Sequence, residues 1–180
     1  MRTELYRIEG PWPERFAITP RPRGGDWLED EVSNWREAGL DVVVSLLTQD
    51  EVAEFNLDKE EALCQSYGIR FISFPVPDRG TPGSGEEFPS LVRGLLCVLN
   101  EGKSVAVHCR QGVGRSALLA ACLLVASGGK TENAFRQISG ARGCVVPDTE
   151  DQKEWVKAFA MELSSQSENR PPSGALVRPA

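Results

Sequence analysis

Residues 105–116 read Val-Ala-Val-His-Cys-Arg-Gln-Gly-Val-Gly-Arg-Ser. The opening residues are typical of a buried strand, and the two glycines predict a tight loop. The apolar run 116–126 that follows is predicted to be a helix. A strand, loop and helix in this order gather backbone N–H groups and the positive end of a helix dipole around the loop. The loop is therefore predicted to bind an anion.

Strands and helices are predicted to alternate along the rest of the chain. Strands are expected at residues 5–8, 16–18, 41–47, 69–76 and 104–108. Helices are expected at residues 26–38, 49–54, 57–67, 87–100, 116–126, 131–139 and 149–163. This order indicates an α/β fold with a central, mainly parallel (mixed) sheet flanked by helices on both faces. A chain of 180 residues suits one domain, placed at 1–163, and the tail 164–180, rich in Ser and Pro, is predicted to be disordered.

Two residues make the predicted loop reactive as well as anion-binding. Cys109 opens the loop, where N–H groups and the helix dipole favour the thiolate over the thiol. Arg115 follows six positions later, and its planar fork can hold two phosphate oxygens. A nucleophile that faces a clamped oxyanion indicates phosphoryl transfer to sulfur, and Ser116 is placed to donate a hydrogen bond to that sulfur. The alternative is that Cys109 is a buried core cysteine and Arg115 a surface arginine.

The motif His108-Cys109-x-x-Gly112-x-x-Arg115-Ser116 resembles the signature of the cysteine-based protein tyrosine and dual-specificity phosphatases. The chain is most similar to the small atypical members of the cyclin-dependent-kinase-associated type. The resemblance implies that residues 1–163 are a single phosphatase domain and that His108 orients the loop and favours the thiolate; a core histidine is the alternative. It assigns phosphate binding to Arg110, Gln111, Gly112, Val113, Gly114 and Arg115.

Asp78 is the candidate general acid. It lies in the Pro- and Gly-rich loop 77–85, 31 residues before Cys109. It follows the strand 69–76, which we expect to neighbour the catalytic strand. A carboxylic acid there can protonate the leaving oxygen and then act as base toward water, and the resemblance implies an acid aspartate at about this distance. Asp78 is also a good turn former, which is the alternative reading.

Gln152 is the candidate for the second step. The segment Pro147-Asp148-Thr149-Glu150-Asp151-Gln152 resembles the loop that carries a water-orienting glutamine in some of these phosphatases. Thr149-x-x-Gln152 also matches a helix capping box, so a structural role is equally open. Asp148 can be read as a second acid or as an exposed turn residue, and we favour the turn.

Charge and composition limit the partners. A net charge of −6 argues against nucleic acid or an anionic membrane as a bulk partner, because either would favour a basic surface. The apolar run 117–126 is about half the length of a membrane span, and the first residues lack the apolar segment of a signal peptide. We therefore expect a cytoplasmic protein, and the sequence leaves its oligomeric state open.

The five cysteines form no CxxC pair. Cys64, Cys97 and Cys122 lie in apolar stretches and are expected to be reduced core residues, which fits a reducing compartment. Cys144 either packs as an inert thiol or traps an oxidised Cys109 as a disulfide. The sequence shows no cluster of metal ligands, and we expect neither a metal nor another cofactor.

The resulting functional hypothesis is a phosphoprotein phosphatase. It would hydrolyse phosphotyrosine, and phosphoserine or phosphothreonine, in proteins or peptides through a phosphocysteine intermediate. The loop contains no lysine, which phosphoinositide-directed relatives tend to carry. A lipid or small-metabolite phosphatase with the same chemistry is the main alternative; a rhodanese-like sulfurtransferase and a non-catalytic phosphate-binding module are less favoured.

Overall fold

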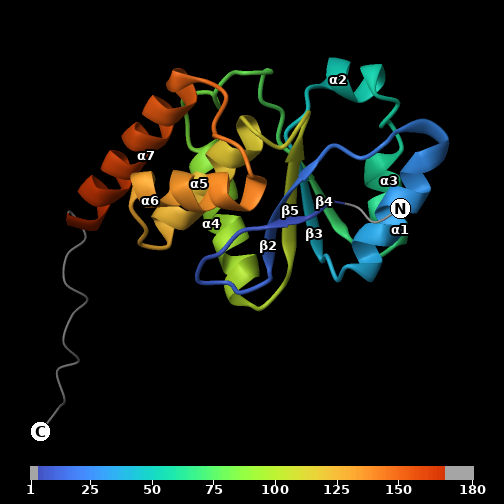
Figure 1. Cartoon of the computed structure of the whole chain (residues 1–180), viewed down its shortest axis with the longest axis horizontal. Helices are drawn as coiled ribbons and strands as arrows, with labels where there is room; N and C mark the ends of the chain where they lie inside the picture. The colour runs from blue at the N-terminus through green and yellow to red at the C-terminus, as the bar shows by residue number, and fades with distance from the viewer. Residues whose placement is uncertain (1–3, 169–180) are drawn as a thin grey trace, which may run out of the picture.

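The computed structural model of the chain describes residues 4–168 and contains one five-stranded sheet (Figure 1). The strand order is β1-β2-β5-β3-β4. The bounds are β1 Tyr6–Arg7, β2 Phe16–Pro20, β3 Val42–Ser45, β4 Arg70–Ser73 and β5 Val105–Cys109. Only β1 and β2 pair antiparallel, while the other neighbouring strands are parallel. The predicted mixed, mainly parallel sheet is confirmed.

Helices cover both faces of this sheet, as the sequence predicts (Figure 1). One face carries α1 (Leu28–Glu37), which follows the short 3₁₀ helix η1 (Gly25–Trp27), and α3 (Glu60–Ser66). The other carries α4 (Glu87–Asn100), α5 (Arg115–Ala126), α6 (Thr131–Arg142) and α7 (Glu150–Glu168). The short helix α2 (Gln49–Glu54) lies beyond the ends of the strands, where it can reach the phosphate loop.

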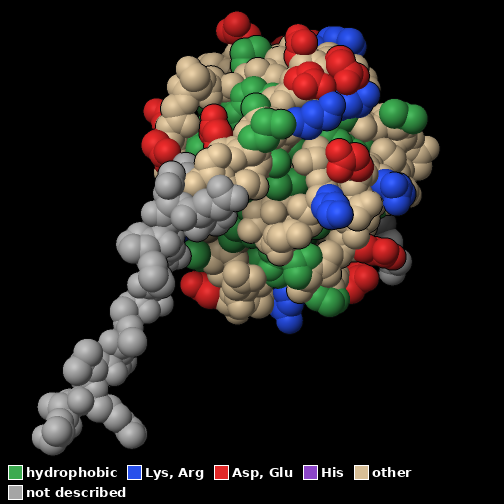
Figure 2. Space-filling model, turned by 90° about the vertical axis from the view of Figure 1, so that its left-hand side faces the viewer, with side chains coloured by type: hydrophobic (Ala, Val, Ile, Leu, Met, Phe, Trp, Pro, Cys, Tyr) green, Lys and Arg blue, Asp and Glu red, His purple; other side chains and the backbone are tan. Residues whose placement is uncertain are grey.

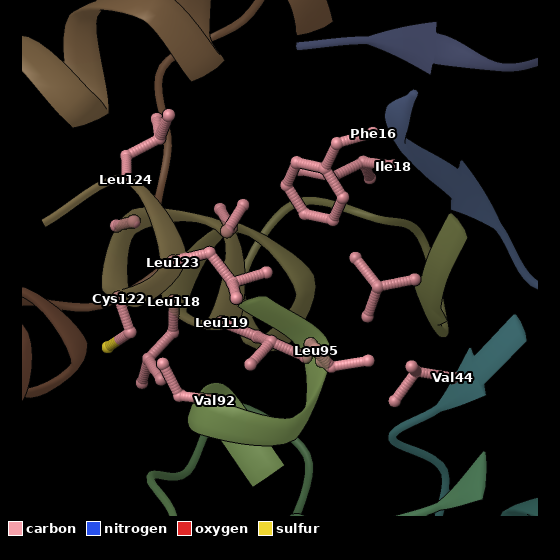
Figure 3. Close-up of a cluster of buried hydrophobic side chains, with 14 of the residues drawn as sticks. Phe16, Ile18, Val44, Val92, Leu95, Leu118, Leu119, Cys122, Leu123 and Leu124 are labelled. Atoms are coloured by element: carbon pink, nitrogen blue, oxygen red, sulfur yellow. The ribbon is translucent and has the colours of Figure 1, made fainter. Parts of the chain in front are cut away.

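The larger core forms around α5, which is buried almost all round. Leu118, Leu119 and Leu123 of this helix lie among side chains from α4 and from the sheet (Figure 3). Each fully buried leucine contributes about 1.5–3 kcal/mol to folding. The helix is fixed by contacts on every side, and its N-terminus is therefore held at a constant position beneath the end of β5.

A smaller core lies on the opposite face. Trp35 of α1 and Cys64 of α3 pack there with Val43 and Ala106, which alternate along their strands with residues of the larger core. This two-sided burial explains why Val42, Val43 and Val44 are apolar in succession rather than alternating with polar residues.

Several details differ from the sequence-based expectations, among them Cys144, which is exposed rather than packed. The strand β4 does not neighbour the catalytic strand, because β3 lies between β4 and β5. Cys97 is exposed rather than part of the core, since α4 turns Val92, Leu95 and Leu99 inward and leaves Cys97 on its outer face. Helix α7 continues past Leu163 to Glu168. The rest of the predicted disordered tail, 169–180, lies outside the described residues.

Surface charge, helix hydropathy and the placement of possible metal ligands can be compared with the expected partners. On the face that includes α7, acidic and basic side chains are interspersed rather than gathered by sign (Figure 2). Within residues 4–168, no helix is long and apolar enough to cross a membrane. The same residues contain no group of three His, Cys, Asp or Glu side chains arranged to hold a metal ion.

Candidate active site

The site lies where the parallel strands β2, β5, β3 and β4 end at the same edge of the sheet. Cys109 is the last residue of β5 and pairs with Pro20 of β2. The loop 110–114 then leads into α5, which begins at Arg115. Cys109 and Arg115 line a pocket of about 180 Å³ together with Asp78, Arg79 and Asp148. Ligands of open α/β sheets bind at such strand ends.

Gly112 allows the loop to pass close to β2. Its φ is +69°, and a Cβ atom there would lie 2.9 Å from both Ile18 Cγ2 and the carbonyl oxygen of Thr19. A side chain therefore meets backbone as well as an unfavourable dihedral. This is the physical reason why the signature requires glycine at position 112.

Gly112→Ala is expected to lower kcat/KM by about 10²-fold, because a displacement of the loop near 1 Å misplaces the groups that hold phosphate. Gly68→Ala is the matched control. Gly68 has a φ of +72° with no neighbouring atom within 4 Å, so both variants carry the strain of about 1–2 kcal/mol but only the first carries the clash. Equal activities in the two variants, measured by steady-state kinetics and normalised to folded protein, would contradict this account.

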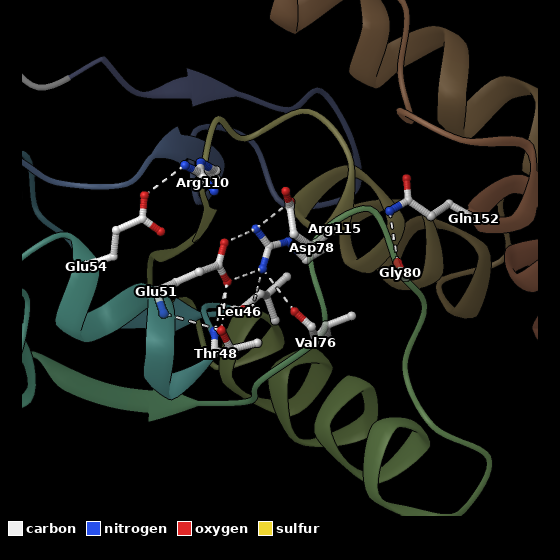
Figure 4. Close-up of polar contacts among 10 residues, drawn as sticks. All are labelled: Leu46, Thr48, Glu51, Glu54, Val76, Asp78, Gly80, Arg110, Arg115 and Gln152. Atoms are coloured by element: carbon white, nitrogen blue, oxygen red, sulfur yellow. Dashed lines mark hydrogen bonds and ion pairs between the residues drawn. The ribbon is translucent and has the colours of Figure 1, made fainter.

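Arg115 is buried and is the centre of the polar network in the pocket (Figure 4). Its Nη1 lies 2.7 Å from Glu51 Oε2 and its Nη2 lies 2.8 Å from Glu51 Oε1, a two-pronged ion pair. Nη1 also donates to the carbonyl oxygens of Leu46 at 3.2 Å and Val76 at 2.9 Å. Nη2 donates in addition to Asp78 Oδ1 at 2.9 Å. The guanidinium is thus held in one orientation before any substrate arrives.

The Arg115–Glu51 pair keeps both groups charged despite their burial. Burial by itself would lower the pKa of Arg115, but the hydrogen bonds that it donates to Glu51 and the charge of Cys109 raise the pKa above its ordinary value. Burial likewise would raise the pKa of Glu51, but Arg115 and Thr48 lower it below its ordinary value of 4.5. The site therefore keeps a fixed positive charge beside the nucleophile.

Glu51 is a site residue that the sequence analysis missed. It occupies position N3 of a capping box whose N-cap residue is Thr48. The Glu51 N–H donates to Thr48 Oγ1, and the Thr48 N–H donates to Glu51 Oε2 at 3.0 Å. The signal was present as Thr48-x-x-Glu51, directly after the buried strand 41–47. A capping carboxylate at the carboxyl end of a central strand is placed at the edge where the phosphate loop also lies.

Asp78 reaches the pocket although its strand is not next to β5. After β4 the chain runs alongside the end of β3, where the Phe74 N–H donates to Ser45 and the Val76 N–H donates to Leu46. This path carries the loop toward α5 and places the Asp78 carboxylate 2.9 Å from Arg115 Nη2. The side chain of Asp78 is half exposed and is therefore accessible to a substrate in the pocket.

Gln152 joins the loop of Asp78 to α7. Its buried side chain donates from Nε2 to the carbonyl oxygen of Gly80 at 2.9 Å (Figure 4). Its backbone N–H donates to Thr149 Oγ1 at 3.2 Å, which is one half of the predicted capping box. A Cβ atom on Gly114 would lie 3.1 Å from Gln152 Nε2 and 2.3 Å from Asp148 Oδ2. Gln152 thus lies between the phosphate loop and the loop of the candidate acid; its water-orienting role remains a prediction.

His108 and Ser116 occupy buried positions on either side of the loop. The imidazole of His108 projects into the smaller core, where Nε2 lies 2.9 Å from Glu60 Oε1 and the ring lies near Trp35. Ser116 Oγ is buried at the first turn of α5 with no hydrogen-bond partner among the described residues. Its hydroxyl proton is therefore not engaged by another group of the described residues.

Comparison with known proteins agrees with this geometry. Residues 19–129 match the family described as "Polymorphic toxin system, DSP-PTPase phosphatase". The chain belongs to the DSP-PTPase phosphatase family. It is 34% identical over 131 residues to human protein tyrosine phosphatase type IVA 3, covering 71% of this chain and 69% of the relative. It is 27% identical over 145 residues to rat cyclin-dependent kinase inhibitor 3, covering 79% and 68%.

Solved structures show the same fold. A kinase-associated phosphatase whose catalytic-site cysteine is replaced by serine superposes with a TM-score of 0.81 at 19% identity, covering 92% of this chain and 98% of that one. Tk-PTP in its active form gives a TM-score of 0.72 at 26% identity, covering 89% and 99%. The chain is thus a small atypical dual-specificity phosphatase, as the signature motif indicates.

The phosphate loop 110–114 is also held by an arginine that the sequence analysis missed. Arg142, at the end of α6, donates from Nε to the carbonyl oxygen of Gly112 at 2.7 Å and from Nη2 to that of Gln111 at 3.0 Å. Its guanidinium lies 3.7 Å from the ring centroid of Tyr6. The carbonyl groups of Gln111 and Gly112 share their peptide bonds with the N–H groups of Gly112 and Val113. A cation bound to these carbonyls polarises the two peptide groups, so their N–H groups become stronger hydrogen-bond donors to an anion.

Proposed function

We propose that this phosphatase hydrolyses phosphotyrosine, phosphoserine and phosphothreonine in proteins, with Cys109 as the nucleophile. The observation that carries the proposal is the arrangement around Arg115. A guanidinium fixed by Glu51 shares one pocket with Cys109 and lies 2.9 Å from the Asp78 carboxylate. Cys109, Arg115 and Asp78 thus line one pocket of about 180 Å³, which supports their roles as nucleophile, positive clamp and proton donor.

In the first step, the Cys109 thiolate attacks phosphorus and forms an S–P bond as the P–O bond to the substrate breaks. Arg115 and the N–H groups of residues 110–114 hold the equatorial phosphate oxygens. Asp78 donates its proton to the departing oxygen, which leaves as a neutral hydroxyl. The products are the dephosphorylated protein and a phosphocysteine.

In the second step, a water molecule replaces sulfur on phosphorus. Asp78, now ionised, accepts a proton from this water, and Gln152 orients the water from its place between the two loops. Inorganic phosphate and the Cys109 thiolate are released. Ser116 donates a hydrogen bond to the sulfur and stabilises it as a leaving group, and His108 holds the start of the loop.

A phosphoprotein substrate is supported by two considerations. The relatives named above carry the names of a protein tyrosine phosphatase and of a kinase inhibitor. The loop residues Arg110, Gln111 and Val113 include no lysine of the kind that phosphoinositide-directed relatives tend to use. We also propose a reducing compartment such as the cytoplasm, because the reaction requires a reduced Cys109.

The direct test is phosphate release from phosphotyrosyl and phosphothreonyl peptides, in the presence of reductant and a metal chelator. We expect release from both peptides. In a parallel assay without the chelator, we expect inhibition by vanadate, which mimics phosphate in the pocket. The same protein is assayed on vesicles that contain a monophosphorylated inositol lipid. Release from the vesicles alone would overturn the phosphoprotein assignment in favour of a lipid phosphatase.

A further inference from the structure

Two arginines beside the phosphate loop lie over a single aromatic ring. The guanidinium carbon of Arg21 is 3.9 Å from the ring centroid of Phe55, and that of Arg110 is 4.9 Å from the same centroid. Arg110 directly follows Cys109, while Arg21 directly follows Pro20, the partner of Cys109 in β2. Phe55 ends α2. Three separate segments thus bring two positive charges next to the nucleophile.

The ring positions these guanidinium groups without neutralising them. A cation–π contact at a partly exposed site contributes about 0.5–1 kcal/mol and leaves the N–H edge of the guanidinium free to donate. Arg21 Nη1 donates to the carbonyl oxygen of Pro22 at 3.3 Å, which uses one of the five N–H groups of that side chain. The remaining donors are available to an anion that lies beside Phe55.

A carboxylate of the chain itself marks one position for such an anion. Glu54 Oε1 lies 3.0 Å from Arg110 Nη2, and the two side chains are 53% and 41% exposed. Arg110 reaches toward Glu54 and away from the Asp78–Arg115 pair (Figure 4). An ion pair this exposed contributes about 0–1 kcal/mol, so a more strongly charged group can displace Glu54.

We infer that Arg21, Phe55 and Arg110 form a subsite for a second phosphate group on the same polypeptide substrate. The inference deepens the proposed function and rests on it. A phosphate group carries about −1.5 to −2 charges and three acceptor oxygens, so it can bridge both guanidinium groups. A single carboxylate such as Glu54 has less charge and fewer acceptors. The enzyme therefore prefers a protein that is phosphorylated at two nearby residues.

Charge supports this selection at short range. The chain carries a net charge of −6, which repels acidic substrates at a distance, and salt screens that repulsion beyond about 8–10 Å. Attraction must come from cations within direct reach of the scissile phosphate. Arg110 lines the pocket of Cys109, and Arg21 lies over the same Phe55 ring as Arg110, so both can attract a phosphate group beside the scissile one.

The test compares two peptides of one sequence that carry either one phosphate or two phosphates at neighbouring residues. For the wild type we expect a kcat/KM about 10-fold higher on the doubly phosphorylated peptide, the effect of roughly one charge-assisted contact. Arg21→Met is expected to reduce this ratio by about 5-fold. Glu54→Gln is expected to raise it by about 2–3-fold, because Arg110 loses its internal competitor. Arg136→Met, which removes an exposed arginine of α6, should leave the ratio unchanged.

Arg21→Met is expected to lower the ratio of the two kcat/KM values, and Glu54→Gln is expected to raise it. A loss of folding would instead lower the rate on both peptides alike and leave the ratio unchanged. A ratio near one that neither Arg21→Met nor Glu54→Gln alters, in an enzyme active on the singly phosphorylated peptide, would overturn the subsite alone. Failure on every peptide would overturn the proposed function as well. If vesicles with a bisphosphorylated inositol lipid show the dependence on Arg21 and peptides show none, the second phosphate belongs to a lipid and the inference is wrong.

Discussion

Cys109→Ser is expected to lower kcat for phosphate release by about 10⁴-fold or more, the scale on which loss of the nucleophile acts in other covalent enzymes. The physical reason is that a serine hydroxyl is a much weaker acid and a much weaker nucleophile than a cysteine thiol. The variant should still bind vanadate, because Arg115 and the loop N–H groups are unchanged. Cys97→Ser, at an exposed cysteine of α4, is the matched control and should retain activity.

The same experiment extends to the candidate acid. Asp78→Asn is expected to lower kcat by about 10²–10⁴-fold on phosphothreonyl peptides, where the leaving alkoxide needs a proton. The loss should be much smaller on an activated aryl phosphate, whose leaving group departs without one. Asp78 also contacts Arg115 at 2.9 Å, so the comparison of substrates separates two roles. An equal loss on both substrates would show that Asp78 acts by orienting Arg115 and would contradict its role as acid.

Glu51→Gln is expected to lower the free energy of unfolding by about 3 kcal/mol and kcat/KM by about 10²-fold. The pair with Arg115 is almost entirely buried, with 1% and 8% of the two side chains exposed. Removal of Glu51 leaves the buried Arg115 charge with the half-exposed Asp78 carboxylate as its remaining ionic partner. It also frees the guanidinium to leave the orientation in which it meets phosphate. Urea unfolding and steady-state kinetics measure the two effects.

The stability loss in Glu51→Gln should depend on pH in a definite direction. The pKa of Glu51 is lowered in the folded protein relative to its ordinary value of 4.5. The pair therefore stabilises the wild type above pH 4.5, and this contribution is lost as the pH falls through the folded pKa. The stability difference between wild type and Glu51→Gln should narrow below pH 4.5.

Asp50→Asn provides the control for Glu51→Gln, because Asp50 is an exposed carboxylate of the same helix. Its effect on the free energy of unfolding should stay within about 0.5 kcal/mol.

For Glu51→Gln, a difference from wild type in the free energy of unfolding that is constant across the acid range would contradict the prediction. It would mean that the Glu51 carboxylate does not stabilise the fold through its charge.

The reactive loop was readable from the sequence because its chemistry is local. Cys109, Gly112 and Arg115 lie within one strand–loop–helix unit, and the residues between them set the distance from sulfur to guanidinium. The valines 42–44 within the predicted strand 41–47 are likewise typical of a strand buried on both faces, and Val43 and Val44 do face different cores. In both cases the controlling interactions are among neighbours in the chain.

The supports of the loop were not readable in this way. Glu51 lies 64 residues from Arg115 in the sequence, and Arg142 contacts the loop from the end of another helix. Capping boxes and helix-ending arginines are common, so neither pattern reveals which partner it meets. The order β5-β3-β4 was also misjudged, because the apolar pattern of a strand indicates its burial and not its neighbours.

The sequence alone predicted the fold class and pointed to Cys109 and the loop 110–114 as the candidate site, since short-range backbone geometry and residue type specify these features. Tertiary packing determined the rest. It oriented Arg115 through Glu51, brought Asp78 past the end of β3 to the pocket, and set Arg21 and Arg110 over Phe55. These contacts join segments far apart in the chain, and their formation depends on how the helices and strands bury their apolar faces together.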